Sequence, residues 1–574
     1  MCAIIGQAGG PLDKEKFVQA RDLMITRGPD DSGSYYDEKN VVALGHRRLS
    51  IIDLSSAGKQ PMFSHEGRYV IVFNGEIFNF IELRAELSNY PFKTKTDTEV
   101  LLAAYFKWGK DCLGKLNGQF AFTIYDTKNG ELFCARDHLG IKPFYYAIQD
   151  RKFLFASEIK SILALGIKAR PNDKIIFEYL RQSFYDHSED TFFVGIKKLM
   201  PGEYGVWKDG VFSKGIYWDL AKMRDREGEH GRLSSGEAIE SFKTLMADVI
   251  RLQFRSDVPV GLNLSSGLDS MSMLFFANKV IGGDIRLFSA GLSDHRYDES
   301  NYLKKLLAER QKKFLYTSTL VPEKVWPLVD KLMEIQDEPY GGFSTINYLN
   351  LYQETRIPGV KVLLEGQGVD EILGGYRYYN VNQSRQSFSQ DMTKEGAPDV
   401  LRSDLAGFQE NKLDFPTPFK SPLLNDQYRD LRYTKLPRVL RFNDHISLAY
   451  SRELRVPYLD RRLVEFCFFL PAKFKIDGDR RKVLLRDAMK GIVPEADRSR
   501  SKVFFGAFQT DWLRKYFKEQ VYEFINSQSF QSRPYWDYPK LKEKVDSFFA
   551  GKGENSFFLW QWLNLEMWLR KYID

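Results

Sequence analysis

Cysteine at position 2 is the residue of this chain that could do chemistry with the fewest partners. After removal of the initiator methionine, Cys2 carries a thiol and a free α-amino group on one residue. The amine has a reference pKa of about 7.7–8.0 and the thiol one of about 8.5, so the amine can act as the base that activates the thiol. This pairing predicts a nucleophile that needs no separate histidine.

Several short motifs follow Cys2 in the first third of the chain. They are RGPDD at 27–31, HRRLSI at 46–51, FNGEIFN at 73–79, DTE at 97–99 and ARDHLGIKP at 135–143. Taken singly they are unspecific, since an Asn-Gly dipeptide is also a common tight turn. In this order behind Cys2, they resemble the glutaminase domain of the class II, N-terminal-nucleophile glutamine amidotransferases. The resemblance is to the glutamine-hydrolysing asparagine synthetases in particular.

The resemblance carries the chemistry of glutamine hydrolysis onto three residues. Cys2 looks like the nucleophile that attacks the glutamine carboxamide and forms a glutamyl thioester. Asn74 and the backbone N–H of Gly75 look like the oxyanion hole. Their role is to stabilise the developing O⁻, and loss of one such donor typically costs about 10²–10³ in rate.

The same resemblance implies how glutamine is bound. Arg48 looks like the ligand of the α-carboxylate, for which a guanidinium fork is suited, although Arg47 beside it is an alternative. Glu76 and Asp97 look like acceptors for the α-ammonium group.

A second motif, LSSGLDS at 264–270, follows an expected strand at 260–264 and opens an expected helix at 269–280. Small residues with a glycine let backbone amides approach a phosphate at a helix N-terminus. The chain contains no GxxxxGK[ST], which excludes a Walker-type site. The motif resembles the pyrophosphate loop of the ATP pyrophosphatases. That implies a synthetase domain that turns an acceptor carboxylate into an acyl-AMP and releases pyrophosphate.

The resemblance extends to residues that hold ATP, Mg²⁺ and the acceptor. It implies that Asp269 and Asp370 hold Mg²⁺ and that Lys482 stabilises the leaving pyrophosphate. The nucleotide is assigned to Leu264, Ser265, Ser266, Gly267, Asp269, Ser270, Ser289, Glu365 and Gly366, and the acceptor to Gln367, Asp370 and Glu371. RVPYLD at 455–460 matches a further family segment, to which we assign no role.

One position departs from the family pattern. Asparagine synthetases usually read Ser-Gly-Glu-Gly-x-Asp-Glu where this chain reads EGQGVDE at 365–371. Gln367 can donate and accept hydrogen bonds but cannot hold an α-ammonium by charge. Glu365 could compensate if its side chain turns inward. Sequences with this Gln-Gly-x-Asp-Glu pattern look similar to asparagine-synthetase homologues that modify sugar carboxylates in surface-polysaccharide biosynthesis. The acceptor is therefore left open between L-aspartate and a sugar uronate.

Two other functions compete with glutamine-dependent amide synthesis. An intramolecular amide former of the β-lactam-synthetase or lasso-cyclase kind shares the second domain, but such relatives generally lack the position-2 cysteine and its partners. A non-catalytic, nitrogen-sensing homologue would be expected to have lost nucleophile or phosphate-binding residues. None of these residues is lost here.

The elements that must position these residues fall into two groups. The first group predicts an α+β domain at 2–210, with strands at 69–74, 120–126 and 131–135 and helices at 81–87 and 99–107. The resemblance implies that this domain consists of stacked antiparallel sheets with flanking helices. A charged, polar stretch predicts a linker at 211–235. Alternating strands and helices then predict an α/β, doubly wound parallel sheet at 236–574 with a largely helical C-terminal part. Loops or partial disorder are expected at 378–430.

Composition limits the remaining possibilities. At 574 residues, two or more domains are expected. The 83 basic and 76 acidic side chains give a net charge of +7 without a basic run, so a nucleic-acid partner is not indicated. No stretch is apolar enough to span a membrane, and the Trp-rich tail at 557–572 is expected to be a buried or docking helix in preference to a membrane anchor. Four scattered cysteines fit a reducing, cytoplasmic setting, and a homodimer is compatible with the sequence.

Overall fold

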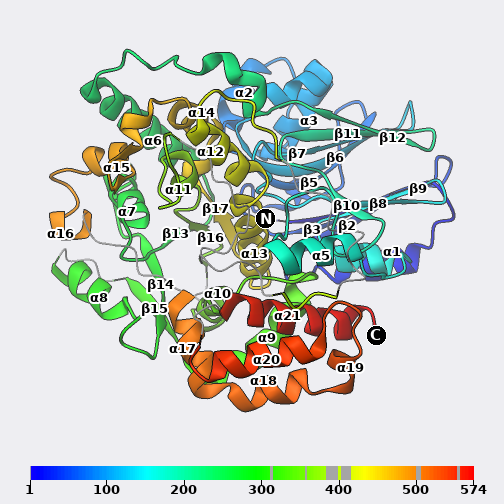
Figure 1. The fold of residues 1–574 in the computed structure, drawn as a ribbon. Coiled ribbons are helices and arrows are strands. Elements are labelled where there is room, and N and C mark those ends of the chain that lie inside the picture. The colour runs from blue at the N-terminus through cyan, green and yellow to red at the C-terminus, as the bar shows by residue number, and fades with distance from the viewer. Residues whose placement is uncertain are drawn as a thin grey trace.

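Two six-stranded antiparallel sheets, stacked face to face, form the N-terminal part of the chain (Figure 1). Because alternate residues of a strand point to opposite faces, each sheet has one face toward its neighbour and one toward helices. In β1 (Ala3–Ala8), Ile4 lies in the core between the sheets and Ile5 in the core beneath the helices. The computed structural model describes residues 2–309, 314–355, 359–382, 399–402, 415–498, 506–552 and 556–574.

The first sheet has the order β10-β8-β9-β1-β3-β2 and the second the order β12-β11-β7-β6-β5-β4. The strands of the first sheet besides β1 are β2 (Asp31–Asp37), β3 (Val42–Arg48), β8 (Tyr145–Gln149), β9 (Lys152–Ala156) and β10 (Ile196–Lys198). Those of the second are β4 (Met62–Phe63), β5 (Tyr69–Ile77), β6 (Gly118–Asp126), β7 (Glu131–Arg136), β11 (Glu203–Lys208) and β12 (Val211–Ile216). Helices α1 (Lys14–Asp22), α4 (Ile159–Ala164) and α5 (Asp173–Gln182) cover the first sheet, and α2 (Phe80–Glu86) and α3 (Asp97–Trp108) the second. This layering confirms the α+β prediction.

A five-stranded parallel sheet organises the second part, in the order β15-β14-β13-β16-β17. Its strands are β13 (Val260–Asn263), β14 (Arg286–Leu292), β15 (Leu315–Leu320), β16 (Val362–Leu364) and β17 (Glu453–Arg455). Both faces are covered: Leu364 packs in the core with α6 and α7, whereas Leu363 packs in the core with α9 and α10. The sheet is therefore doubly wound, as predicted. The strand order reverses between β13 and β16, the place where such sheets bind their ligands.

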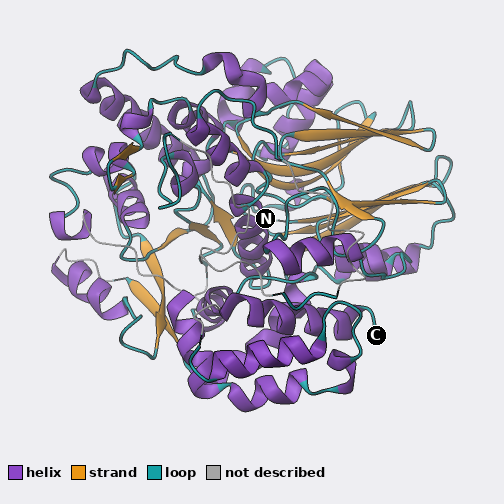
Figure 2. Cartoon of the chain, in the orientation of Figure 1, coloured by secondary structure: helices purple, strands orange, loops and turns teal. Residues whose placement is uncertain are grey.

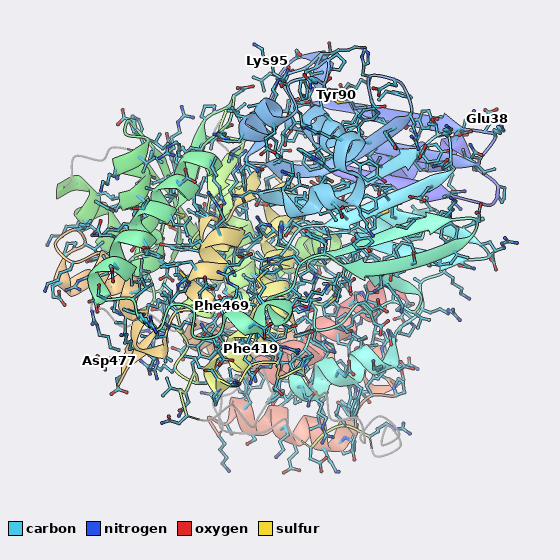
Figure 3. All side chains as sticks on the ribbon, turned by 90° about the horizontal axis from the view of Figure 1, so that it is seen from above. Glu38, Tyr90, Lys95, Phe419, Phe469 and Asp477 are labelled. Atoms are coloured by element: carbon cyan, nitrogen blue, oxygen red, sulfur yellow. The ribbon has the colours of Figure 1, made fainter. Side chains whose placement is uncertain are left out.

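The helices of the second part lie around this sheet. They are α6 (Ser235–Gln253), α7 (Leu268–Val280), α8 (Ser300–Glu309), α9 (Val325–Gln336), α10 (Phe343–Glu354), α11 (Val369–Ile372), α12 (Pro422–Arg432), α13 (Lys435–Leu448), α14 (Arg461–Phe468), α15 (Val483–Ala488) and α16 (Glu495–Arg498). Phe419 and Phe469, labelled in Figure 3, pack in the core beside α12 and α14, with ring centroids 6.2 Å apart.

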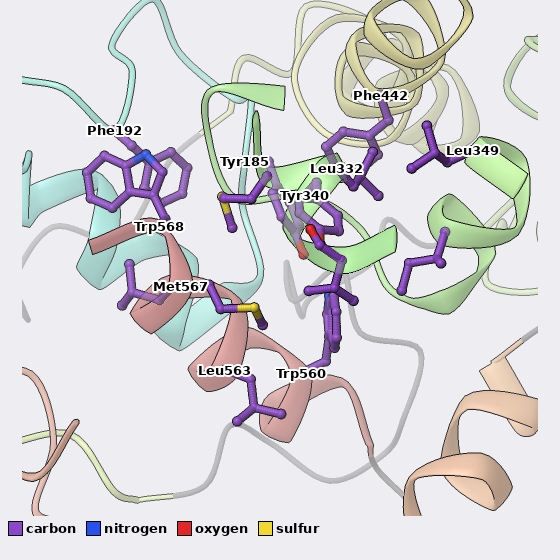
Figure 4. Packing of buried hydrophobic residues seen from close by; sticks show 14 of the residues in the cluster. Tyr185, Phe192, Leu332, Tyr340, Leu349, Phe442, Trp560, Leu563, Met567 and Trp568 are labelled. Carbon is purple, nitrogen blue, oxygen red and sulfur yellow. The ribbon is translucent and has the colours of Figure 1, made fainter. Parts of the chain in front are cut away.

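The C-terminal part is helical, as predicted, and its strand-free layer is plain in Figure 2. It consists of α17 (Gly506–Tyr516), α18 (Lys518–Ile525), α19 (Gln528–Gln531), α20 (Tyr538–Phe549) and α21 (Ser556–Tyr572). The apolar tail forms α21, whose Trp560 and Trp568 are fully buried against α5, α9 and α10 (Figure 4). Each indole N–H donates to a backbone carbonyl, that of Gly341 and Asp337 respectively, at 3.0 Å. No helix in the described part of the chain is long and apolar enough to cross a membrane.

Two sequence-based boundaries were wrong. Residues 211–216, expected at the start of the linker, form β12 and pair with β11 along its whole length. The linker is therefore shorter and ends at Ser234, which caps α6 together with Glu237 in a capping box. Residues 378–430 were expected to be loops or partly disordered, but the end of this segment belongs to α12, and 383–398 and 403–414 lie outside the described residues.

Candidate active sites

Cys2 immediately precedes β1, and the N-terminal end of the chain lies between the two parts (Figure 1). The Cys2 carbonyl accepts a hydrogen bond at 3.3 Å from Arg27, which is also paired with Asp444 of α13. Cys2 is 8% exposed and borders a cleft. The cleft is also lined by Arg48, Gly75, Glu76 and Asp97. The structure thus gathers residues from β1, β3, β5 and α3 that the sequence analysis assigned to glutamine.

Burial raises the pKa of the Cys2 thiol, while a backbone hydrogen bond from Leu49 works in the opposite direction. A thiol in such a site needs a base close at hand to supply its thiolate. The Cys2 backbone N–H, which becomes the α-amino group once Met1 is removed, donates to Asn74 Oδ1 at 3.2 Å. The nucleophile and the base expected for it are therefore both anchored on β5.

Asn74 and Gly75 form the part of the cleft suited to a negative oxygen. Asn74 is fully buried, and its Nδ2 has no hydrogen-bond partner within the described residues. A buried amide donor without a partner is costly and is expected to have a ligand in function. Gly75 has φ +156°, and a Cβ there would overlap the Gln119 carbonyl oxygen of the neighbouring strand. Only glycine fits at this position.

The structure separates the two neighbouring arginines of β3. Arg48 points into the cleft, where its guanidinium donates to the carbonyls of Ser55, at 2.7 Å, and Asp53. Arg47 points the other way and donates to Gly28 O at 3.0 Å and to Asp22 at 3.3 Å. This alternation along the strand supports Arg48 as the carboxylate ligand.

Glu76 and Asp97 place two carboxyl groups in the same buried cleft. Burial, together with the nearby carboxylates Glu453 and Asp97, raises the pKa of Glu76 well above its ordinary value. Burial also raises the pKa of Asp97 to about 6, although the Ile77 N–H donates to it at 2.9 Å. Glu76 Oε2 has no hydrogen-bond partner in the described part of the chain. In their charged forms, the two carboxylates are suited to accept a cationic ammonium group.

Arg455, at the end of β17, is a glutaminase-site neighbour that the sequence analysis missed. Its Nη2 lies 3.6 Å from Glu76 Oε1, and its Nε donates to Glu453 at 2.5 Å. Its Nη1 donates to the carbonyls of Gln253 and Arg255, each at 2.7 Å. The only signal in the sequence was its place in a family segment to which we assigned no role. A residue of the synthetase part therefore borders the glutamine site.

The second site lies at the point where the strand order of the parallel sheet reverses. The loop after β13 carries Ser265, and its backbone N–H and side-chain oxygen each lie 3.1 Å from Ser270 Oγ of α7. The loop after β16 approaches it closely, since a Cβ on Gly366 would lie 3.4 Å from Asp269 Cβ. Ser265 and Gly267 are exposed, so the N-terminus of α7 is open to an anion.

Lys482 joins the two loops. Its Nζ lies 2.7 Å from Asp269 Oδ2 and 2.7 Å from Asp370 Oδ1. Lys482 has φ +54°, a left-handed conformation held at the start of α15. A Cβ on Gly375 would overlap both Asp370 Oδ1 and Lys482 Cε, so any larger residue there would displace these two groups. Two hard carboxylate ligands that already converge on a cationic amine also fit Mg²⁺, which needs only one or two protein carboxylates beside phosphate oxygens.

The residues that the sequence analysis assigned to the nucleotide and the acceptor differ in burial and in their contacts. Gln367 is half-buried at the site and makes no side-chain hydrogen bond within the described residues. Glu371 accepts from Tyr376 OH at 2.6 Å, and burial raises its pKa to about 7. Leu264 has its side chain in the core, and Ser289 lies buried in β14, so neither presents an exposed polar side chain.

Glu365 does turn inward, but its oxygens are engaged. Asn263 Nδ2 donates to it at 2.5 Å and Asn443 Nδ2 at 3.0 Å, and Tyr352 OH donates at 3.3 Å. Burial raises its pKa to about 7. A carboxyl group that is partly neutral and surrounded by amide donors is a weak substitute for the missing glutamate at position 367.

Comparison with known proteins agrees with this geometry. A family model described as a glutamine amidotransferase domain matches residues 1–218, and one described as asparagine synthase matches residues 241–570. Asparagine synthetase (glutamine-hydrolyzing) 1 of Bacillus subtilis (strain 168) is 29% identical, with 99% of this chain and 96% of that protein covered. Asparagine synthetase (glutamine-hydrolyzing) 3 of the same organism is 30% identical, with 84% of this chain and 82% of that protein covered.

The chain belongs to the glutamine-hydrolysing asparagine synthetase family. It is a glutamine-dependent amidotransferase of that type, a carbon–nitrogen ligase of the AMP-forming class. The family uses ATP with Mg²⁺.

Proposed function

We propose that this enzyme hydrolyses glutamine at Cys2 and uses the ammonia to amidate a carboxylate that it first activates as an acyl-AMP. The observation that carries the synthetase half is the meeting of Asp269 and Asp370 at Lys482 Nζ, each 2.7 Å away, where the strand order reverses. The three charged groups lie beside the N-terminus of α7, where we expect the phosphates of a bound nucleotide. The glutaminase half is supported by Asn74, which lies beside Cys2 and whose buried Nδ2 has no hydrogen-bond partner among the described residues.

In the glutaminase half, the Cys2 thiolate attacks the carboxamide carbon of glutamine. The α-amino group of Cys2 takes the thiol proton and later delivers it to the leaving ammonia. Asn74 Nδ2 and the Gly75 N–H stabilise the negative oxygen of the tetrahedral intermediate. Water then hydrolyses the glutamyl thioester, releasing glutamate and restoring the thiol.

In the synthetase half, a carboxylate oxygen of the acceptor attacks the α-phosphorus of ATP and pyrophosphate leaves. Lys482, the hydroxyl groups of Ser265 and Ser270 and the amides at the start of α7 would stabilise the departing charge. Asp269 and Asp370 would hold Mg²⁺, which supplies charge neutralisation at the phosphates when bound. Ammonia then attacks the acyl carbon, AMP leaves and the amide is formed.

For the acceptor, we infer a sugar uronate in preference to free L-aspartate. The inference is supported by Gln367, which has no charge to offer an α-ammonium, and by Glu365, whose oxygens already bind Asn263 and Asn443. Amide groups of this kind are suited to hydroxyl groups, which both donate and accept hydrogen bonds. The cytoplasmic location and a homodimer stay predictions.

A screen for pyrophosphate release tests the proposal. Purified enzyme is given glutamine, ATP-Mg²⁺ and either L-aspartate or a uronic-acid nucleotide sugar, and both glutamate and pyrophosphate are followed. We expect an acceptor-dependent rise in pyrophosphate with the uronate. Equal or faster turnover of L-aspartate contradicts the acceptor assignment, and no acceptor-dependent pyrophosphate with any carboxylate contradicts amide synthesis altogether.

A further inference from the structure

Lys475 is a fully buried lysine that neither reaction uses. Within the described residues it has no carboxylate at ion-pair distance. Its Nζ donates to Gln427 Oε1 at 2.9 Å and to Phe468 O, at the C-terminal end of α14, at 2.5 Å. A buried ammonium without a carboxylate is expensive, and burial lowers the pKa of Lys475 to about 7. A group kept at such a cost is expected to have a specific task.

The side chain of Lys475 supports the loop that carries Asp370. Gln427, its partner on α12, is also fully buried. Nε2 of the same Gln427 side chain donates to the backbone carbonyl of Glu371 at 2.5 Å. Lys475 therefore fixes the orientation of Gln427, and Gln427 in turn holds the residue next to Asp370.

The backbone of Lys475 supports the segment that carries Lys482. Lys475 immediately precedes a two-stranded hairpin, β18 (Ile476–Asp477) and β19 (Arg480–Arg481), and Lys482 immediately follows it. The Lys475 carbonyl accepts a hydrogen bond from the Val483 N–H at 3.2 Å, which closes the base of the hairpin. Asp477, beyond Lys475 on the hairpin, lies at the outer edge of the molecule (Figure 3).

The two supported segments also pack on one another at Lys475. Gly374 has φ +66°, and a Cβ there would lie 3.0 Å from Ile476 Cγ1 and 3.4 Å from Lys475 Cβ. The turn that follows Asp370 thus rests directly on the base of the hairpin. A shift of either segment would change the distance from Asp370 to Lys482, now 2.7 Å.

We infer that Lys475 is a positioning residue for the pyrophosphate end of the synthetase site. Its side chain holds the Asp370 loop through Gln427, and its backbone holds Lys482 through Val483. Lys475 thereby fixes the position of Asp370 relative to Lys482. The inference rests on the function proposed for Lys482. It adds a residue that touches no substrate but determines the geometry of two residues that do. Partners that orient the residues of a site typically contribute about 10–100-fold to activity.

Two substitutions test this role separately. Lys475→Met keeps the length and the buried volume but removes the ammonium, and Gln427→Leu removes the side-chain link while leaving Lys475 in place. We expect kcat for pyrophosphate formation to fall about tenfold or more in each. The kcat and KM of glutaminase should stay within about twofold of wild type, since the change is confined to the second site. The matched control is Lys473→Met, an exposed lysine of the same segment.

The outcomes separate the two claims. Wild-type enzyme that forms no acceptor-dependent pyrophosphate contradicts the proposed function. Active wild type with unchanged pyrophosphate kcat in folded Lys475→Met and Gln427→Leu overturns the positioning role. Hydrogen exchange gives a readout that needs no turnover: amides of 369–373 and 482–486 should exchange faster in Gln427→Leu and Lys475→Met, and unchanged exchange in both segments overturns the inference. If Lys475→Met does not fold, Gln427→Leu alone decides.

Discussion

Glu76 of the glutaminase part and Arg455 of the synthetase part face each other across the boundary, with Oε1 and Nη2 3.6 Å apart. Both side chains are buried, and Arg455 is held from behind by Glu453 and by two backbone carbonyls. The guanidinium lowers the pKa of Glu76 against the larger effect of burial, which raises it. A carboxylate expected to bind glutamine is thus kept closer to its charged form by the other part of the chain.

The first prediction concerns this contact. In Arg455→Lys, the shorter amine stays with Glu453 and the carbonyls and withdraws positive charge from Glu76. Glu76 is then more often protonated, and we expect KM for glutamine to rise about tenfold, the equivalent of about 1.4 kcal/mol of binding. Glutaminase kinetics without ATP measure this. Arg452→Lys is the matched control, because Arg452 is equally buried but donates to Thr355, away from the cleft. An unchanged KM would show that the contact has no role in glutamine binding.

The second prediction separates the two halves of the reaction. Cys2→Ala removes the nucleophile and should abolish glutamate release from glutamine. Added ammonium should still support pyrophosphate formation with the acceptor at close to the wild-type rate, because no residue of the second site is changed. Both products are followed in parallel. Loss of both activities in a folded variant would argue against separate sites.

The third prediction concerns Asn74 Nδ2, which has no hydrogen-bond partner in the part of the chain that the structure describes. Asn74→Ala removes one donor from the oxyanion hole and should lower glutaminase kcat about 10²–10³-fold, with a smaller change in KM. Ammonium-dependent synthesis serves as the internal control and should be unaffected. Ser161→Ala, at another buried polar atom without a partner in the described chain, should leave kcat within about twofold. A loss of less than fivefold in Asn74→Ala would mean that the oxyanion is stabilised elsewhere.

The site residues that could be predicted from sequence share one property: each belongs to a short motif whose residue types are dictated by local geometry. Gly75 must be glycine because β6 lies against it, and Asp269 stands in the first turn of a helix that follows a strand. Arg455 could not be assigned, because its partner Glu76 comes from a distant segment of the chain. Lys475 was missed for a similar reason, since a lone lysine in a charged segment is indistinguishable from a solvated one.

The errors in the fold have a physical cause as well. β12 is an edge strand with one exposed face, so its lysine and glycine gave it the composition of a linker. The helix α12 is amphipathic, but it also buries polar side chains. Among them, Asp426 pairs with Arg429 and Asp430 accepts a hydrogen bond from Thr434. The few apolar residues of α12 do follow a helical period, but the polar majority gave the segment the composition of a loop.

The fourth prediction tests the close packing at Lys482. In Gly375→Ala, the added methyl group would overlap Asp370 Oδ1 and Lys482 Cε and push the two apart. We expect pyrophosphate formation to fall about 10²-fold or more, the scale on which small displacements of catalytic groups act. Glutaminase activity should be retained. Gly478→Ala is the control, since that glycine lies at the hairpin with no atom close enough to meet a Cβ, although its φ of +54° adds some strain. Similar losses in both would make the effect one of stability.

The last prediction is a pH dependence of glutamine binding. Burial raises the pKa of Asp97 from its ordinary value to about 6, so the carboxyl group takes up a proton as the pH falls below that value. Protonated Asp97 cannot attract the α-ammonium of glutamine by charge. KM for glutamine should therefore rise as the pH is lowered from 7 to 5. In Asp97→Asn, KM should be high throughout and should lose the rise centred near pH 6. If wild type and Asp97→Asn show the same pH profile, another group governs the titration, and the assignment of Asp97 to the ammonium is wrong.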